Sequence, residues 1–407
     1  MWSVVKKELR ILQGQKVLAF LILVTILRKT LFNRVRDMNA YSSVDANSSI
    51  AIFATIIMGV IVFQNWRKIR KEMRMCDTFI YYYVFAGISV CWAGFNFLPI
   101  IGYKAVEVIV SFVATLTIMK NLRDNASRFI FVIMSFTICN VIYLIMVLKT
   151  GQGHDNAFPL LAITEFLLII GAVKFRLTNW KHMRHHLFVC SATIILGTSS
   201  ASWISLIIGL FFFFSITKRG VNIFAAVLAA GFFYGIWSFF EEDVIKIVFG
   251  NKTKEMIESG SGREALWMAY LRGWLESPLV GHGFIVGEKG AVAAKYIAFA
   301  TNTAHNMMIS VLINTGLVGM AFWIAFLYKQ CIICWRYSLK HNQYALICIP
   351  AICIPAIIAM FVNANSFPVI GSEWSPISNP IYALLIFVFV YIPFSQRVGI
   401  NEKCLTK

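Results

Sequence analysis

Two residues far apart in the chain have the chemistry to act together on a charged substrate. Arg263 opens the stretch REALWMAYLRGW, and its guanidinium could hold an anion such as a diphosphate. His305 stands in TNTAHNMMIS, between small polar residues and a long apolar run. A neutral imidazole there could accept a proton from a hydroxyl. Both residues need elements that bring them to one place.

Arg263 is expected in the first turn of a helix over 262–276. Ser261 and Glu264 have the spacing of a capping box, and Pro278 ends the helix. The helix dipole disfavours a cation in a first turn, so an arginine there makes better sense if an anion binds at the free N–H groups. A solvated surface arginine is the alternative, and composition alone favours neither.

The same helix is predicted to carry an aromatic face. Trp267, Tyr270, Leu271, Trp274 and Leu275 recur at helical spacing. Such a face is typical of a helix lying at a membrane interface.

A glycine-rich turn follows this helix in the sequence PLVGHGF (278–284). Gly281 and Gly283 predict a tight turn with close approach of backbones. His282 between them could contact a sugar, although we favour a turn histidine exposed to water. Glu241, in the sequence EED, could also contact a sugar, and a solvated acidic cluster is the favoured alternative.

His305 is expected at the start of the next membrane helix. Thr303 is its predicted cap, which puts His305 in the first turn, where the dipole favours the neutral imidazole. Asn306 beside it could orient a ligand hydroxyl. Taken alone, His305 would instead be interpreted as a histidine whose side chain reaches to the lipid headgroups.

The elements that carry these residues are predicted to be membrane helices. The chain has 407 residues, of which 59% are hydrophobic and 14% charged, and a soluble fold of this length could not bury so much apolar surface. The sequence therefore predicts an all-α polytopic membrane protein. Its twelve spans are expected at 17–33, 48–65, 78–96, 100–119, 129–148, 158–174, 186–199, 201–216, 220–239, 304–327, 344–362 and 378–395.

The basic residues behind the formal net charge of +18 lie mostly in every second connector between the predicted spans. The stretch 240–303 is close to neutral, so the positive-inside rule puts it in the periplasm and both termini in the cytoplasm. Scattered basic residues without a common face exclude nucleic-acid binding. His182, His185 and His186 lie in a basic connector and are predicted to form a charged edge rather than a metal site.

Four motifs occur in order: S-G-R, S-P-L-x-G-x-G-F, A-H-N and N-T-G-L-V-G. The series resembles the O-antigen ligase and O-antigen polymerase superfamily of bacterial inner-membrane glycosyltransferases. The matching core spans about 190–325 of a single membrane domain, 1–407. The resemblance implies transfer of an undecaprenyl-diphosphate-linked glycan to an acceptor hydroxyl, with inversion and with neither metal nor nucleotide. It implies that Arg263 contacts the diphosphate and that His305 activates the hydroxyl.

One position departs from the family pattern. Ser200, in GTSSASW (197–203), stands where the family usually has a second arginine. Arg272, Lys295 or another basic residue substitutes, or the diphosphate is held more weakly, or activity has been lost. The hydroxyl of Ser200 could still donate a hydrogen bond.

Three functions remain open from the sequence. The first is a polymerase of lipid-linked repeat units, and the second is a ligase with lipid A-core as the acceptor. Membrane lipids, a flippase and a chain-length regulator are the expected partners. The third is a polysaccharide transporter or flippase, which predicts intramembrane charges or broken helices; the sequence indicates neither, apart from Arg28 and Lys29.

Overall fold

The computed structural model describes residues 16–31, 46–150, 157–197, 203, 205–210, 263–289, 304, 306–338, 343–348, 351 and 378–393. These residues are mainly helical and contain no strand, which confirms the all-α class. The helices are α2 (Lys16–Leu31), α3 (Ala46–Met73), α4 (Asp77–Ile88), α5 (Val90–Ala93), α6 (Leu98–Lys120), α7 (Asn125–Thr150), α8 (Ala157–Lys174), α9 (Trp180–Gly197), α14 (Arg263–Trp274), α15 (Val286–Lys289), α17 (Met307–Ser338) and α19 (Ser378–Ile386), with the short 3-10 turns η3 (Arg74–Cys76) and η4 (Phe95–Phe97) and the π-helical turn η6 (Phe387–Tyr391).

Four stretches of the described residues are long and apolar enough to cross a bilayer. They are Ser49–Ala93, Phe95–Lys120, Asn125–Lys149 and Met307–Lys329. The membrane class is thereby confirmed, while the count of twelve spans stays a prediction because 220–239 lies outside the described residues.

The first of these stretches, Ser49–Ala93, covers the predicted spans 48–65 and 78–96. These two spans were expected to be joined by a basic loop. The connector RKIRKEMR continues α3 as helix instead of forming a loop, and η3 then leads directly into α4. Its lysine, arginine, glutamate and methionine residues all favour helix, so local propensity extends the element.

Asparagine and aspartate side chains set where several helices begin. Asp124 Oδ1 accepts a 2.8 Å hydrogen bond from the Ser127 amide at the start of α7. Asn179 Oδ1 accepts a 3.0 Å bond from the His182 amide at the start of α9. Each cap satisfies an amide that lacks a partner within its own helix.

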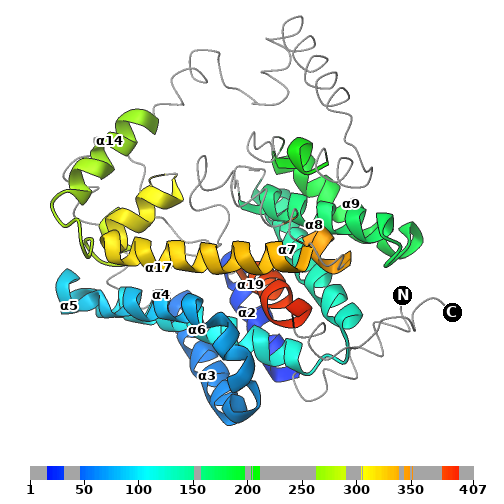
Figure 1. Cartoon of the computed structure of the whole chain (residues 1–407), viewed down its shortest axis with the longest axis horizontal. Helices are drawn as coiled ribbons and strands as arrows, with labels where there is room; N and C mark the ends of the chain where they lie inside the picture. Colours follow the sequence, from blue (N-terminus) through cyan, green and yellow to red (C-terminus); the bar gives the residue numbers. More distant parts are fainter. Residues whose placement is uncertain are drawn as a thin grey trace, which may run out of the picture.

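Aromatic side chains fill the centre of the bundle, where α4, α6, α17 and α19 meet (Figure 1). Phe79 stacks on Phe112 at a centroid distance of 4.1 Å. Tyr382 meets these two rings edge-on at 5.7 and 5.6 Å. Phe326 of α17 lies 6.2 Å from Phe79, so α17 is anchored in the middle of the core.

The bundle has two chemically distinct ends. At one end, ion pairs join Lys120 to Glu72 and Lys329 to Asp77, all in or beside predicted basic connectors. At the other end, the turn before α5 contacts the long loop, because the Phe284 amide donates to Ser89 Oγ at 2.9 Å. The basic connectors that the ion pairs join therefore lie at the same end of the bundle, as the predicted orientation requires.

No intramembrane charge was expected apart from Arg28 and Lys29, yet the predicted span 158–174 contains a buried acidic residue. Glu165 of α8 is fully buried, accepts a 2.7 Å hydrogen bond from Asn140 Nδ2 and also accepts one from the Thr137 hydroxyl. His186 Nδ1 lies 2.6 Å from that hydroxyl, so His186 joins a buried cluster, whereas His182 and His185 are exposed as expected. The sequence of the span shows this glutamate but not the partners that satisfy it.

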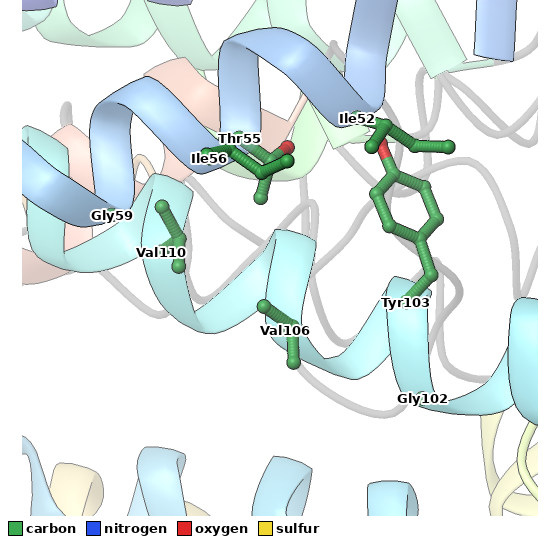
Figure 2. Close-up of a pocket in the computed structure, with 8 residues that line it drawn as sticks. All are labelled: Ile52, Thr55, Ile56, Gly59, Gly102, Tyr103, Val106 and Val110. Atoms are coloured by element: carbon green, nitrogen blue, oxygen red, sulfur yellow. The ribbon is translucent and has the colours of Figure 1, made fainter. Parts of the chain in front are cut away.

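An apolar groove of about 300 Å³ lies between α3 and α6. Figure 2 shows its lining: Ile52, Thr55, Ile56, Gly59, Gly102, Tyr103, Val106 and Val110. The lining is almost entirely apolar, which suits a surface beside lipid chains, and the groove contains none of the predicted site residues.

Candidate active site at the break in α17

The predicted loop helix is present as α14. It begins at Arg263 and ends at Trp274, ahead of Pro278, so Arg263 does occupy the first turn. Ser261, its predicted cap, lies outside the described residues.

Much of the aromatic face of α14 packs on protein, while its placement at the membrane interface stays a prediction. Tyr270 is fully buried and, with Leu266, forms a cluster with Ala304, Ile309 and Ile313. The partly buried rings of Trp267 and Trp274 flank this cluster, whereas Leu275 is 66% exposed. The aromatic residues therefore hold α14 against the first turns of α17.

Helical geometry places the two arginines of α14 on different faces. Arg263 precedes Tyr270 by seven residues, about two full turns, so the two positions lie on the same side of α14. Arg272 follows Arg263 by nine residues, about two and a half turns, and its side chain is exposed. Arg272 therefore does not share a face with Arg263.

Helix α17 is broken at Gly316, which has φ 64° and ψ −164°. The break frees the carbonyls of Ile313 and Asn314 and the amides of Leu317 and Val318 from ordinary helical bonding. No broken helix was expected from the sequence. Within a membrane such groups require partners in the protein.

The glycine turn supplies all four partners. The His282 and Gly283 amides donate to the carbonyls of Ile313 and Asn314, each at 2.9 Å. On the other side, the Leu317 and Val318 amides donate to the carbonyls of Pro278 and Leu279 at 2.9 and 3.0 Å. Thus S-P-L-x-G-x-G-F and N-T-G-L-V-G, which are separate motifs in the sequence, form one interlocked unit.

Glycine is required where the two backbones cross. A Cβ on Gly316 would lie 2.4 Å from the Leu279 carbonyl, and a Cβ on Gly281 would lie 2.6 Å from the Thr315 amide nitrogen. Gly281 also has a φ of 68°, which disfavours any residue with a side chain. The predicted close approach at this turn is confirmed.

His282 is not a water-exposed turn residue. It is half-buried, and its Nε2 donates a 2.8 Å hydrogen bond to the Gly273 carbonyl at the end of α14. Because Nε2 carries the proton in that contact, Nδ1 of the neutral ring is the acceptor. His282 thereby ties the turn to α14.

Helix α17 begins at Met307, three residues later than expected. Asn306, not Thr303, is the cap, because its Oδ1 accepts from the amides of Met308 and Ile309 at 3.0 and 3.2 Å. His305, which comes before this cap in the sequence, lies outside the described residues. Since the Asn306 oxygen is used in capping, any contact with an acceptor hydroxyl would come from its Nδ2.

The buried carboxylate of Glu288 holds the segment beside His305. Glu288 Oε1 accepts from the Ala304 amide at 2.6 Å and from the Ser310 hydroxyl at 2.8 Å. The Glu288 amide donates to Asn314 Oδ1 at 2.9 Å. Residues on both sides of His305 are thus fixed to the loop.

Comparison with known protein families shows which family this region resembles. The family model described as O-Antigen ligase matches residues 186–324, which include α14, the glycine turn and the break in α17. Residues 186–324 are similar to the O-antigen ligase family. The resemblance drawn from the four motifs is therefore confirmed, and among curated proteins none matches the chain.

Tyr270 is part of the packing that holds the glycine turn and α14 together. Its hydroxyl donates to the Glu288 carbonyl at 3.1 Å. Burial, followed by the negative charge of Glu288, raises the pKa of Tyr270 above its ordinary value. The phenol therefore stays protonated and keeps donating throughout the physiological pH range.

Several predicted site residues lie outside the described part of the domain. They are Ser200, Glu241 and His305, and for Arg263 only the backbone is described. Their roles stay predictions. Sequence reasoning in turn missed Glu288, which stands in an ordinary-looking G-E-K and becomes notable only when its buried partners are known.

Proposed function

We propose that the chain polymerises undecaprenyl-diphosphate-linked repeat units into O-antigen or a related surface polysaccharide. The observation that carries this proposal is the interlock of the glycine turn with the broken α17. It holds α14, the helix that begins at Arg263, against α17, whose cap Asn306 follows His305 in the sequence. An anion clamp and a base on such closely packed segments are the parts that glycosyl transfer from a lipid diphosphate needs.

In the proposed reaction, His305 takes the proton of the acceptor hydroxyl as its oxygen attacks the anomeric carbon. The bond from that carbon to the diphosphate oxygen breaks, and the electron pair leaves with undecaprenyl diphosphate. Arg263 stabilises the charge that develops on this leaving group. Attack from the face opposite the leaving group inverts the anomeric centre.

The second contact to the diphosphate is proposed at the Ser200 hydroxyl. Arg272 is the weaker choice, because it lies on the face of α14 opposite Arg263. It also stands in the last turn of α14, where the helix dipole favours a cation without any ligand.

The proposed setting is the bacterial inner membrane, with the site on the periplasmic side and both termini in the cytoplasm. The two ends of the bundle support this, since the ion-paired basic connectors gather at the end away from the glycine turn.

Surface-polysaccharide gel profiles test the function. A deletion strain carrying the wild-type gene should show a ladder, whereas His305→Ala and Arg263→Ala should each show a single repeat unit. His182→Ala and Arg123→Ala are matched controls, because both side chains are exposed at the basic end of the bundle. Both controls should restore the ladder.

The same gel separates the alternatives. Loss of every repeat unit from lipid A in the deletion strain would identify an O-antigen ligase, which uses the same chemistry with a different acceptor. A transporter or flippase is favoured by one observation, the buried cluster around Glu165. Full activity of His305→Ala together with loss of activity in Glu165→Gln would select the transporter.

A further inference from the structure

A cluster of polar side chains lies where α7, α8 and α9 pack together (Figure 1). Thr137 and Asn140 come from α7, Glu165 comes from α8 and His186 comes from α9. Glu165 and Asn140 are completely buried, and the His186 side chain keeps 17% of its surface exposed. His186 is the first residue of the matched range 186–324, whereas the other three precede it, so the cluster joins the two parts of the chain.

The Thr137 hydroxyl is the bridge of this cluster. Its Oγ1 contacts Glu165 Oε1 and lies 2.6 Å from His186 Nδ1, and a third contact, the Ile133 carbonyl at 3.0 Å, can only accept. A hydroxyl has one proton to donate, so it serves at most one of its two ionisable partners. The other partner must carry a proton of its own and donate it to Oγ1. At least one proton beyond that of Thr137 is therefore held between the imidazole and the carboxyl group.

Two arrangements of protons satisfy these contacts without movement of a side chain. In the first, His186 Nδ1–H donates to Thr137, and Thr137 donates to the ionised Glu165. In the second, protonated Glu165 donates to Thr137, and Thr137 donates to Nδ1. The first becomes the second when the Nδ1 proton moves to Oγ1 while the Oγ1 proton moves to Oε1. An imidazolium and a carboxylate then become an imidazole protonated on Nε2 and a neutral carboxylic acid, so protons and charge balance.

Glu165 differs from two other buried carboxylates in its choice of partner. Glu72 and Glu107 each pair with a lysine. Among the described residues, the charged partner of Glu165 is His186, whose Nδ1 lies 3.8 Å from Oε1. A buried carboxylate without a permanent cation depends on a proton that its partner carries. Acidic groups that face the interior of a membrane bundle are typical of proton relays.

The other titratable groups around the cluster leave His186 as its entrance. Cys139 of α7 and Cys190 of α9 are buried thiols, which are uncharged at neutral pH. His185 of α9 acts on His186 and is exposed. His186 Nε2 has no hydrogen-bond partner within the described part of the chain, and its ring is partly exposed, so a proton from solvent can reach the cluster there.

We propose that Glu165, Thr137 and His186 form a proton-binding site in which the threonine hydroxyl relays a proton between the imidazole and the buried carboxyl group. The proton enters at His186 Nε2, in the predicted basic connector 174–186, and is stored on Glu165. Both states hold α9 to α7 and α8, because the same three contacts persist. The ligand of this site is the proton itself, whichever glycan the chain handles.

Infrared difference spectra of the purified full-length protein in liposomes test this site. The protein is brought from about pH 8 to about pH 5, the range in which histidine normally titrates. The wild-type protein should gain the C=O stretching band of a protonated carboxylic acid, and ¹³C-carboxyl labelling of glutamate should shift this band. If wild type gains no glutamic acid band, the proposal is contradicted without recourse to any variant.

Three variants identify the members of the site. Glu165→Gln should abolish the band, and its packing is preserved because Asn140 Oδ1, which has no partner among the described residues, can accept from the new amide when the Asn140 amide turns over. Thr137→Val keeps the shape of the side chain and removes the relaying oxygen. It and His186→Gln should also lose the band from the difference spectrum, because the buried acid no longer exchanges a proton with an imidazole.

His182→Gln and Thr164→Val are the matched controls. His182 is exposed on the same helix as His186, and Thr164 is buried beside Glu165 but bonds to the Leu160 carbonyl of its own helix. Both should keep the wild-type band. Survival of the band in Glu165→Gln or His186→Gln, or its loss in both controls, would overturn the proposal. Because the readout is protonation and not glycan transfer, failure of this site and failure of the proposed function are told apart.

Discussion

At the scale of single residues, the side chains best defined by the structure hold the site together. Glu288 and Asn306 fix the backbone on either side of His305, and His282 fixes the glycine turn to α14. The side-chain acceptors of Glu288 and Asn306 are costly to remove, because the buried donors that they satisfy cannot turn to water.

Glu288 gives the sharpest test at this scale. Glu288→Ala leaves the Ala304 amide and the Ser310 hydroxyl unsatisfied, at about 1–3 kcal/mol for each group. Hydrogen exchange of the Ala304 amide should become faster by about tenfold or more. Glu288→Gln keeps an acceptor oxygen and should stay close to the wild-type rate.

The exposed Glu276 provides the control for this measurement, and Glu276→Ala should not change exchange at Ala304. Equal exchange in wild type and Glu288→Ala would show that the carboxylate does not hold this segment.

At the scale of elements, the break in α17 is the feature on which the loop depends. The glycine turn repairs the hydrogen bonds that the break removes, so the two elements stabilise each other. Because each element satisfies backbone groups of the other, the part of the loop that the structure describes is held firmly against α17.

Gly316→Ala should undock the loop. The new Cβ would lie 2.4 Å from the Leu279 carbonyl, at a residue whose φ of 64° is already unfavourable for alanine, at a cost of about 1–3 kcal/mol or more. The detergent-solubilised protein should lose thermal stability and become sensitive to protease within 263–289.

Gly59→Ala is the matched helical control, since a Cβ there meets no atom within 4 Å. It should be neutral or slightly stabilising, because alanine favours helix. A Gly316→Ala protein as stable and as protease-resistant as Gly59→Ala would contradict the interlock.

At the scale of the whole molecule, the bundle separates a basic, ion-paired end from the end that carries the glycine turn. The two ends are expected on opposite sides of the membrane. Cys91 is exposed next to the glycine-turn end, so labelling requires a Cys91→Ser background.

In that background, Leu275→Cys should react with a membrane-impermeant thiol reagent in intact spheroplasts. Arg123→Cys should react only after the membrane is opened. Both side chains are exposed in the fold, so access across the membrane decides the result. The reverse pattern would place the proposed active site on the cytoplasmic side.

Much of this organisation could be predicted from the sequence, because periodicity and turn residues act locally. The helix beginning at Arg263, the tight turn at Gly281 and the family motifs were all predicted correctly. The burial of Tyr270 was not predicted, because an aromatic stripe has the same spacing whether it meets lipid or protein.

Other features depend on distant partners and leave no local signal. Glu165 looks like a breach of an apolar span until Thr137 and Asn140 are seen to bind it. Asn306 became the cap in place of Thr303, a shift of a few residues that hydropathy does not resolve. The break at Gly316 follows from pairing with a turn more than thirty residues earlier.

The proton acceptor is tested most directly by the rate of glycosyl transfer from a lipid-linked donor, measured with purified protein in proteoliposomes. His305→Ala should slow transfer about 10²–10⁴-fold, the usual contribution of a general base, with thermal stability unchanged. His182→Ala, at an exposed histidine of the opposite end, should transfer at the wild-type rate. Transfer by His305→Ala at the rate of His182→Ala would contradict the assignment of His305 as the base.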